Sequence, residues 1–136
     1  MQAGAHRLLA RLETRQGPRT CAAFQARLPF AGTLVQARWS GEACWVALGK
    51  LDLGVPLENP ISEPRPGMAL FHPADASETE ILVPYGPTRF ASRHGPLQGT
   101  HFLTILDLPG LAKLGHEVLM GGAKEVRFDW ADQADA

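Results

Sequence analysis

The sequence has only two cysteines, Cys21 and Cys44, among its 136 residues. Two thiols cannot form a disulfide framework or a zinc site, so we expect both to be reduced and buried. The five histidines also lack the His-x-His and His-x-x-x-His spacings that hold metals. We therefore expect no metal site, and the sequence indicates no cofactor.

Long hydrophobic runs are missing as well. No stretch approaches the roughly 20 apolar residues of a membrane span, and Arg7, Arg11 and Glu13 interrupt what would be the apolar core of a signal peptide. With 13 basic and 14 acidic residues, the net charge is −1, which disfavours a nucleic-acid binder. We expect a cytoplasmic protein that binds neither membranes nor nucleic acid.

Three common catalytic signatures are absent: the Gly-x-Ser-x-Gly elbow, the phosphate-binding glycine loop and the dinucleotide fingerprint. Glycine and proline, in contrast, are abundant, with 14 and 11 residues, or 25 of 136. This share exceeds the usual sum of roughly 12%, and it favours strands and loops over a helical bundle. The length predicts one domain over residues 1–136, with its core in 6–129 and a frayed polar tail at 131–136.

Periodicity predicts two helices and about eight short strands. Pro18 suits a first helical turn, and Cys21, Phe24 and Leu28 recur at helical spacing, so we expect a helix over 18–28. A second helix is expected over 108–120, ended by two glycines. A long loop is expected at 49–66. The expected strands are 6–14, 33–39, 43–48, 68–71, 79–83, 89–92, 102–106 and 124–130. This order predicts a mainly β fold with two helices: a closed antiparallel β-barrel with helices over its open ends.

The stretch Pro-Arg-Thr-Cys-Ala-Ala-Phe at 18–24 resembles the start of the first helix in cyclophilins. A closer resemblance is to bacterial and archaeal cyclophilin-like proteins of undetermined function, and it covers residues 6–129. It rests on Arg-Trp-Ser-Gly-Glu-Ala-x-Trp at 38–45, Glu-Asn at 58–59, Pro-Gly at 66–67, Ser-Glu-Thr-Glu-Ile-Leu at 77–82, Tyr-Gly at 85–86 and Arg-Phe-Ala-Ser at 89–92. The resemblance implies a cyclophilin-like barrel without bringing a known activity.

Arg38 lies at a point similar to that of the catalytic arginine of cyclophilins. The histidine that precedes that arginine is absent from Gln36-Ala37-Arg38, and so is the Gln-Gly-Gly-Asp-Phe stretch that builds the proline pocket. Both absences argue against prolyl isomerase activity. The Arg38 guanidinium could instead bind a carboxylate, carbonyl or imide with its fork of donors. Alternatively, Arg38 is a solvated strand residue or pairs with Glu42.

Several other polar and aromatic residues are candidates for a ligand site. Trp39 and Trp45 flank the expected turn at 40–42, where they could be cross-strand partners that wall a pocket or belong to the core. Glu78 and Glu80 share one strand face, so they could share a proton and raise one pKa, or form a solvated face. The remaining candidates are Glu42 as a ligand contact, His72 and His101 as rim bases, Tyr85 as a donor and Arg89 as a second anion clamp.

We therefore expect an accessory or binding protein of a catabolic pathway, which binds a small carboxylate- or amide-bearing metabolite at the barrel mouth. Cyclophilin-like domains also occur in subunits of cyclic-amide and urea-derivative hydrolases, which suggests such substrates by analogy. The alternative is an isomerase or hydrolase with His72 or His101 as its base, and a prolyl isomerase is the third hypothesis. The chain could also form homo-oligomers through exposed strand edges.

Overall fold

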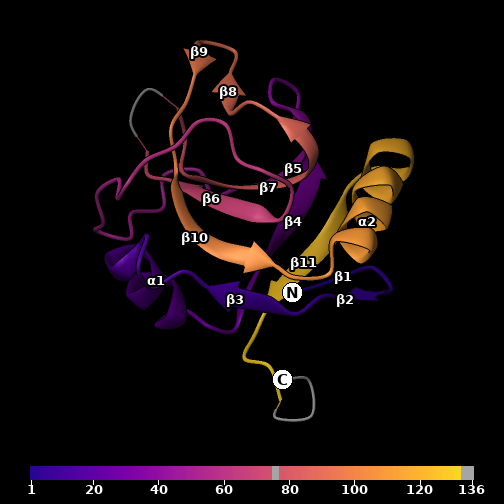
Figure 1. Cartoon of the computed structure of the whole chain (residues 1–136), viewed down its shortest axis with the longest axis horizontal. Coiled ribbons are helices and arrows are strands. Elements are labelled where there is room, and N and C mark those ends of the chain that lie inside the picture. The colour runs from indigo at the N-terminus through magenta and orange to yellow at the C-terminus, as the bar shows by residue number, and fades with distance from the viewer. Residues whose placement is uncertain (75–76, 133–136) are drawn as a thin grey trace.

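The computed structural model describes residues 1–74 and 77–132. Within these residues the chain forms two helices and eleven strands (Figure 1). The elements are β1 (Gln2–Ala3), β2 (His6–Arg7), β3 (Ala10–Leu12), α1 (Pro18–Gln25), β4 (Phe30–Gln36), β5 (Gly41–Ala47), β6 (Met68–His72), β7 (Glu80–Thr88), β8 (Ala91–Ser92), β9 (Gly95–Pro96), β10 (Thr100–Ile105), α2 (Leu108–Gly121) and β11 (Lys124–Phe128). Residues 133–136 of the expected polar tail lie outside the described part.

Nine strands form one antiparallel sheet in the order β2-β1-β11-β4-β5-β7-β6-β10-β3, and β8 pairs with β9 in a separate hairpin. The sheet curls into a half-barrel (Figure 1), so the predicted closed barrel is wrong. The two ends of the order, β2 and β3, have no ladder between them among the described residues. They are two and three residues long, and the two residues between them bond to other segments: the Leu8 amide donates to the Met1 carbonyl at 2.8 Å, and the Leu9 carbonyl accepts from the Leu106 amide at 3.0 Å.

Both predicted helices are confirmed, with small differences at their ends. Helix α1 starts at Pro18 as expected and ends at Gln25, three residues earlier than predicted. Helix α2 starts after Asp107, whose side chain accepts a hydrogen bond from the Gly110 amide at 3.0 Å, and it ends before Gly122 with a φ of 99°. No helix in the described part of the chain is both long and apolar enough to cross a bilayer.

The predicted hairpin of 33–39 and 43–48 is present as β4 and β5, paired through Leu34↔Val46 and Val35↔Trp45. Arg38, however, lies outside the strand. Strand β4 ends at Gln36, whose side-chain amide donates to the carbonyl oxygens of Ala37 at 3.1 Å and Gly41 at 2.9 Å. These bonds close the turn, so Arg38 lies on a bend between the two strands and not within a strand.

Strand β7 continues through the Pro-Tyr-Gly-Pro segment at 84–87, beyond the end of the expected strand 79–83. Strand β6 pairs with β7 only from Glu80 to Leu82, and the later residues pair with β5 alone. Pro84 therefore removes no hydrogen bond to β6, and a proline is tolerated where one strand edge is open.

Strand β1 was not predicted at all. Residues 49–66 contain no strand apart from one isolated bridge, Ile61↔Gly99.

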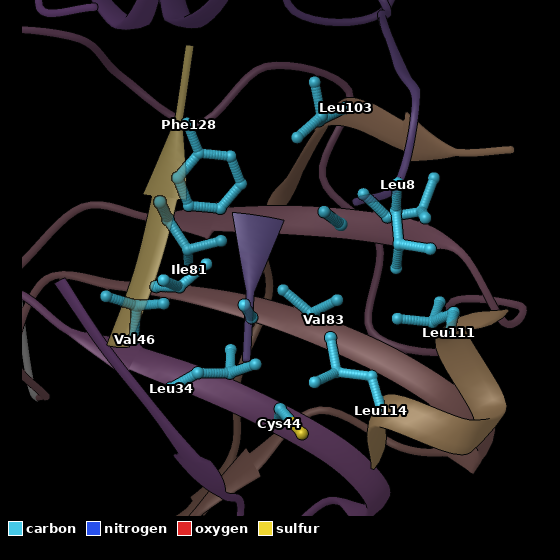
Figure 2. Packing of buried hydrophobic residues seen from close by; sticks show 14 of the residues in the cluster. Leu8, Leu34, Cys44, Val46, Ile81, Val83, Leu103, Leu111, Leu114 and Phe128 are labelled. Atoms are coloured by element: carbon cyan, nitrogen blue, oxygen red, sulfur yellow. The ribbon is translucent and has the colours of Figure 1, made fainter. Parts of the chain in front are cut away.

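Strand alternation separates two apolar clusters on opposite faces of the sheet. Ile81 and Val83 of β7 belong to the larger cluster, which packs against both helices; Figure 2 shows these residues gathered with Leu34, Val46 and Leu114. Leu82 faces the other way, into a smaller cluster composed of Ala37, Ala43, Leu70, Leu82, Phe90 and Leu97. Side chains two positions apart on a strand share a face, so Glu80 lies on the side of this smaller cluster.

Candidate functional site

A groove of about 950 Å³ lies on this second face of the sheet. Three separate segments form its walls: the end of β4 with the turn after it, the start of β7 with the residues before it, and the β8–β9 hairpin. Trp45 of β5 contributes to its lining. The lining residues are Val35, Gln36, Ala37, Arg38, Trp39, Ser40, Trp45, Ser77, Glu78, Glu80, Ala91, Ser92, Arg93 and His94.

The groove brings together five of the ten residues that the sequence marks as candidates. These are Arg38, Trp39, Trp45, Glu78 and Glu80. The β4–β5 hairpin supplies the first three and the β7 segment supplies the two carboxylates. The other candidates do not line it; they are Glu42, His72, Tyr85, Arg89 and His101.

Two arginines provide positive charge to the groove. Arg38 and Arg93 are both exposed, and neither makes an ion pair or side-chain hydrogen bond within the described part of the chain. The pairing of Arg38 with Glu42, which the sequence left open, is therefore not present among these residues. Sequence reasoning missed Arg93. Its position depends on the β8–β9 hairpin, and Gly95 with a φ of 122° in the run Ser-Arg-His-Gly is the local signal for that turn.

The two tryptophans lie differently from one another. Trp39 is 56% exposed, so it is not a core residue. Trp45 is half-buried and packs on the smaller apolar cluster. The two are not cross-strand partners, because Trp45 pairs with Val35 on one side and Leu82 on the other. The groove therefore has one aromatic side chain held against the sheet and a second one exposed to solvent.

Glu80 is the unusual group of this groove. The residue is only 5% exposed, and its side chain has no hydrogen bond or ion pair to any other described residue. No buried side-chain oxygen or nitrogen in the described part lacks a partner, so the Glu80 carboxyl must reach the groove surface. Burial, assisted by the negative charge of Glu78, raises its pKa to about 8. At neutral pH this carboxyl is mainly protonated and can donate a hydrogen bond or exchange a proton.

Neither of the two histidines that were candidate bases lines the groove, although His72 is the cross-strand partner of Glu80. His72 is buried, with Nδ1 2.6 Å from the carbonyl oxygen of Gln98. His101 lines a second, more open groove of about 710 Å³, where its Nε2 lies 2.8 Å from Thr104 Oγ1. The Thr104 hydroxyl donates to Glu13 at 2.7 Å, so the His101 nitrogen must act as the donor to Thr104. Burial lowers the pKa of His101.

Tyr85 holds helix α2 against the sheet. Its hydroxyl donates to Gln36 Oε1 at 2.7 Å, and its ring lies directly against Gly115 of α2. Burial raises the pKa of the Tyr85 hydroxyl, with smaller contributions from Cys44 and Glu42. These contacts give Tyr85 a packing role at the helix–sheet interface.

Glu42 and Arg89 both belong to the exposed surface. The Glu42 side chain lies over Gly86, where an added Cβ would meet it at 2.9 Å. Arg89 pairs with Glu63 at 3.0 Å, and both side chains are largely exposed, so this ion pair contributes little to stability. Neither residue reaches the groove.

Both cysteines are buried, as expected. Burial raises the pKa of Cys21 to about 11 and that of Cys44 to about 12, so neither supplies a thiolate nucleophile at neutral pH. Over residues 1–74 and 77–132, no group of three or more His, Cys, Asp or Glu side chains is arranged to hold a metal ion.

Comparison with known proteins gives similar solved structures and a family. The chain is similar in fold to the structure of McbB in complex with tryptophan, with a TM-score of 0.65 and 16% identity. The match covers 93% of this chain and 42% of McbB, so the chain spans about two-fifths of its neighbour's length. No curated protein matches the sequence. A family model described as protein of unknown function, DUF3830, matches residues 1–130. The chain therefore belongs to the DUF3830 family.

Proposed function

We propose that the groove beside Arg38 binds a small carboxylate- or amide-bearing molecule. The observation that carries this proposal is the pair of exposed guanidinium groups, Arg38 and Arg93, that share a groove with a protonated carboxyl, Glu80. Guanidinium groups bind carboxylates through two parallel hydrogen bonds. A neutral carboxyl donates to carbonyl oxygens. Such a set of donors fits a ligand rich in acceptor oxygens.

The apolar part of the ligand would contact the two tryptophans. Trp45 offers a ring held against the sheet and Trp39 offers one that can move onto a ligand. The volume of about 950 Å³ falls within the usual range for small-molecule sites. The neighbour McbB holds tryptophan, a flat carboxylate-bearing molecule, and this supports the same class of ligand here.

A thermal-shift screen against small carboxylic acids, cyclic amides, ureas and free amino acids tests the proposal. A ligand at about 100 times its Kd should stabilise the protein by roughly 2.7 kcal/mol. We expect the shift to vanish in Arg38→Ala and to persist in Arg15→Ala, a control that removes an exposed arginine outside the groove. The proposal fails if no compound shifts the protein, or if both variants respond as the parent protein does.

A second candidate function is an enzyme that isomerises or hydrolyses the bound molecule. The pKa of about 8 on Glu80 favours it, because a general acid or base works best when its pKa lies near the operating pH. In this hypothesis Glu80 takes the role that the sequence assigned to His72 or His101. Product formation from a ligand found in the screen, lost in Glu80→Gln while that ligand still binds, would support it.

The cyclophilin-like relationship suggested by residues 18–24 is a further part of the proposal. It concerns the fold alone, because the proline-pocket stretch is absent from the sequence. We expect no acceleration of prolyl isomerisation in a proline peptide. The accessory role in a catabolic pathway, the cytoplasmic location and self-association through strand edges remain expectations. Co-purification with a partner would test the accessory role, and the mass in solution would test self-association.

A further inference from the structure

The groove carries charges of both signs on separate segments. Arg38 comes from the turn after β4 and Arg93 from the β8–β9 hairpin, whereas Glu78 and Glu80 come from the start of β7. A simple carboxylate would satisfy the arginines but would also meet the negative charge of Glu78. A ligand with one positive and one negative group would satisfy both sides.

We infer that the ligand is a zwitterion, an α-amino acid with an apolar side chain, whose carboxylate contacts Arg38 and Arg93 while its ammonium group contacts Glu80. This inference rests on the proposed function and specifies the ligand of the same site. The side chain of the amino acid would lie against Trp39 and Trp45, which share the groove.

The burial of Glu80 is the strongest argument for an ammonium partner. Glu80 is a residue only 5% exposed, with Glu78 two positions before it and His72 opposite it on β6, and its carboxyl has no hydrogen bond within the described residues. Such a group is costly to keep, because burial removes much of its water. An ammonium group placed on the groove side would supply the missing partner and a compensating charge. The neutral amide of a cyclic-amide ligand offers no such charge.

The total charge of the groove agrees with this choice. The titratable side chains of the lining are those of Arg38, Arg93, His94, Glu78 and Glu80, so once Glu80 is ionised two arginines and two carboxylates share the groove with one histidine. A ligand of zero net charge with separated ends leaves this balance intact. The exposed Glu78 adds negative charge on the same side as Glu80 and would further attract the ammonium group.

Binding of an ammonium group would change the protonation of Glu80. The carboxyl is mainly protonated before binding at pH 7. Contact with a cation stabilises the carboxylate, so the Glu80 proton leaves to the buffer while no bond of the ligand forms or breaks. Binding should therefore release close to one proton per ligand at pH 7, and affinity should rise between pH 6 and pH 8.

Isothermal titration with matched pairs of compounds tests this. The pairs are L-tryptophan and indole-3-propionate, L-phenylalanine and 3-phenylpropionate, and L-leucine and 4-methylpentanoate; each acid lacks only the amino group. We expect at least one amino acid to bind about 10- to 100-fold more tightly than its partner acid. For that amino acid, the binding enthalpies measured in phosphate and in Tris should differ. The difference should equal the difference between the ionisation enthalpies of the two buffers for close to one proton per ligand.

Substitution at Glu80 separates the possible outcomes. Glu80→Gln should remove the preference for the amino acid and the proton release but keep binding of the partner acid, whereas Glu125→Gln, at an exposed position of β11, should change neither. The inference is overturned if the acids bind as tightly as the amino acids, without proton release, while Arg38→Ala still abolishes their binding. If no compound binds at all, the proposed function fails together with the inference.

Discussion

Replacing Glu80 by glutamine should stabilise the protein at alkaline pH, by roughly 4 to 5 kcal/mol at pH 8.5, and leave its stability nearly unchanged at pH 4.5. The side chain is buried and its pKa is raised from 4.5 to about 8, first by burial and then by the charge of Glu78. Ionisation is therefore far more costly in the folded protein than in the unfolded chain. Glutamine resembles the neutral carboxyl in shape and cannot ionise.

The sign of the effect follows from proton binding. Between pH 4.5 and about 8 the folded protein keeps the Glu80 proton while the unfolded chain has lost it. The free energy of unfolding therefore falls as pH rises through this interval, by about 1.4 kcal/mol per pH unit. Below pH 4.5 both states are protonated and the penalty is absent. Above pH 8 both are ionised and the penalty is constant.

Thermal unfolding from pH 4.5 to 9 provides the measurement. At pH 8.5 the melting temperature of Glu80→Gln should exceed that of the parent protein by about 15 °C. Glu78→Gln should reduce the pH dependence of the parent in part, because it removes the second cause of the raised pKa. Glu125→Gln, at an exposed position of β11, serves as the control and should follow the parent curve. Parallel curves for Glu80→Gln and the parent would show that Glu80 ionises normally.

The buried carboxyl of Glu80 affects both the stability of the protein and the ligand binding proposed for the groove. A buried carboxyl without a partner destabilises the free protein, and glutamine would remove that cost. Its presence in a groove with two exposed arginines is understandable if a ligand supplies the missing partner. The stability experiment and the titration therefore examine the same group by independent routes, one without a ligand and one with it.

The parts of the fold that local signals determine were predictable from the sequence. Pro18 sets the start of α1, Gly122 follows the end of α2, and alternating residues mark the β4–β5 hairpin. Closure of the sheet depends on which edges meet after the chain has folded, and no local pattern contains that information. Pro84 was misleading for the same reason, because its cost depends on whether β6 continues beside it.

The candidate site was also predictable from the sequence only in part. Arg38 and Trp45 lie on one hairpin and Glu78 and Glu80 on one short segment, so sequence alone could group each pair. Bringing the two groups and Arg93 together in one groove requires the tertiary fold. His72 resembled a site residue by its position at a strand end, but burial and its contact with the Gln98 carbonyl remove it from the groove.

Gly115→Ala should destabilise the protein strongly, by about 3 kcal/mol, although alanine is normally the better helix residue by about 1 kcal/mol. Gly115 lies in the interior of α2, and a Cβ at this position would overlap the ring of Tyr85. Tyr85 cannot easily move aside, because its hydroxyl is bonded to Gln36 at 2.7 Å. The helix would have to lift from the sheet, at the expense of the apolar contacts of Leu114 and Val118.

The same helix offers a matched control. Gly121 is the last residue of α2, and an added Cβ there would meet no atom within 4 Å, so Gly121→Ala should be neutral or slightly stabilising. In thermal unfolding we expect Gly115→Ala to melt roughly 10 °C below the parent protein and Gly121→Ala to melt with it. Adding Gly115→Ala to a Tyr85→Ala variant should cost little, since the obstructing ring is gone. If Gly115→Ala alone were as stable as the parent, Tyr85 would not be packed against α2, and it would again be a candidate to contact a ligand.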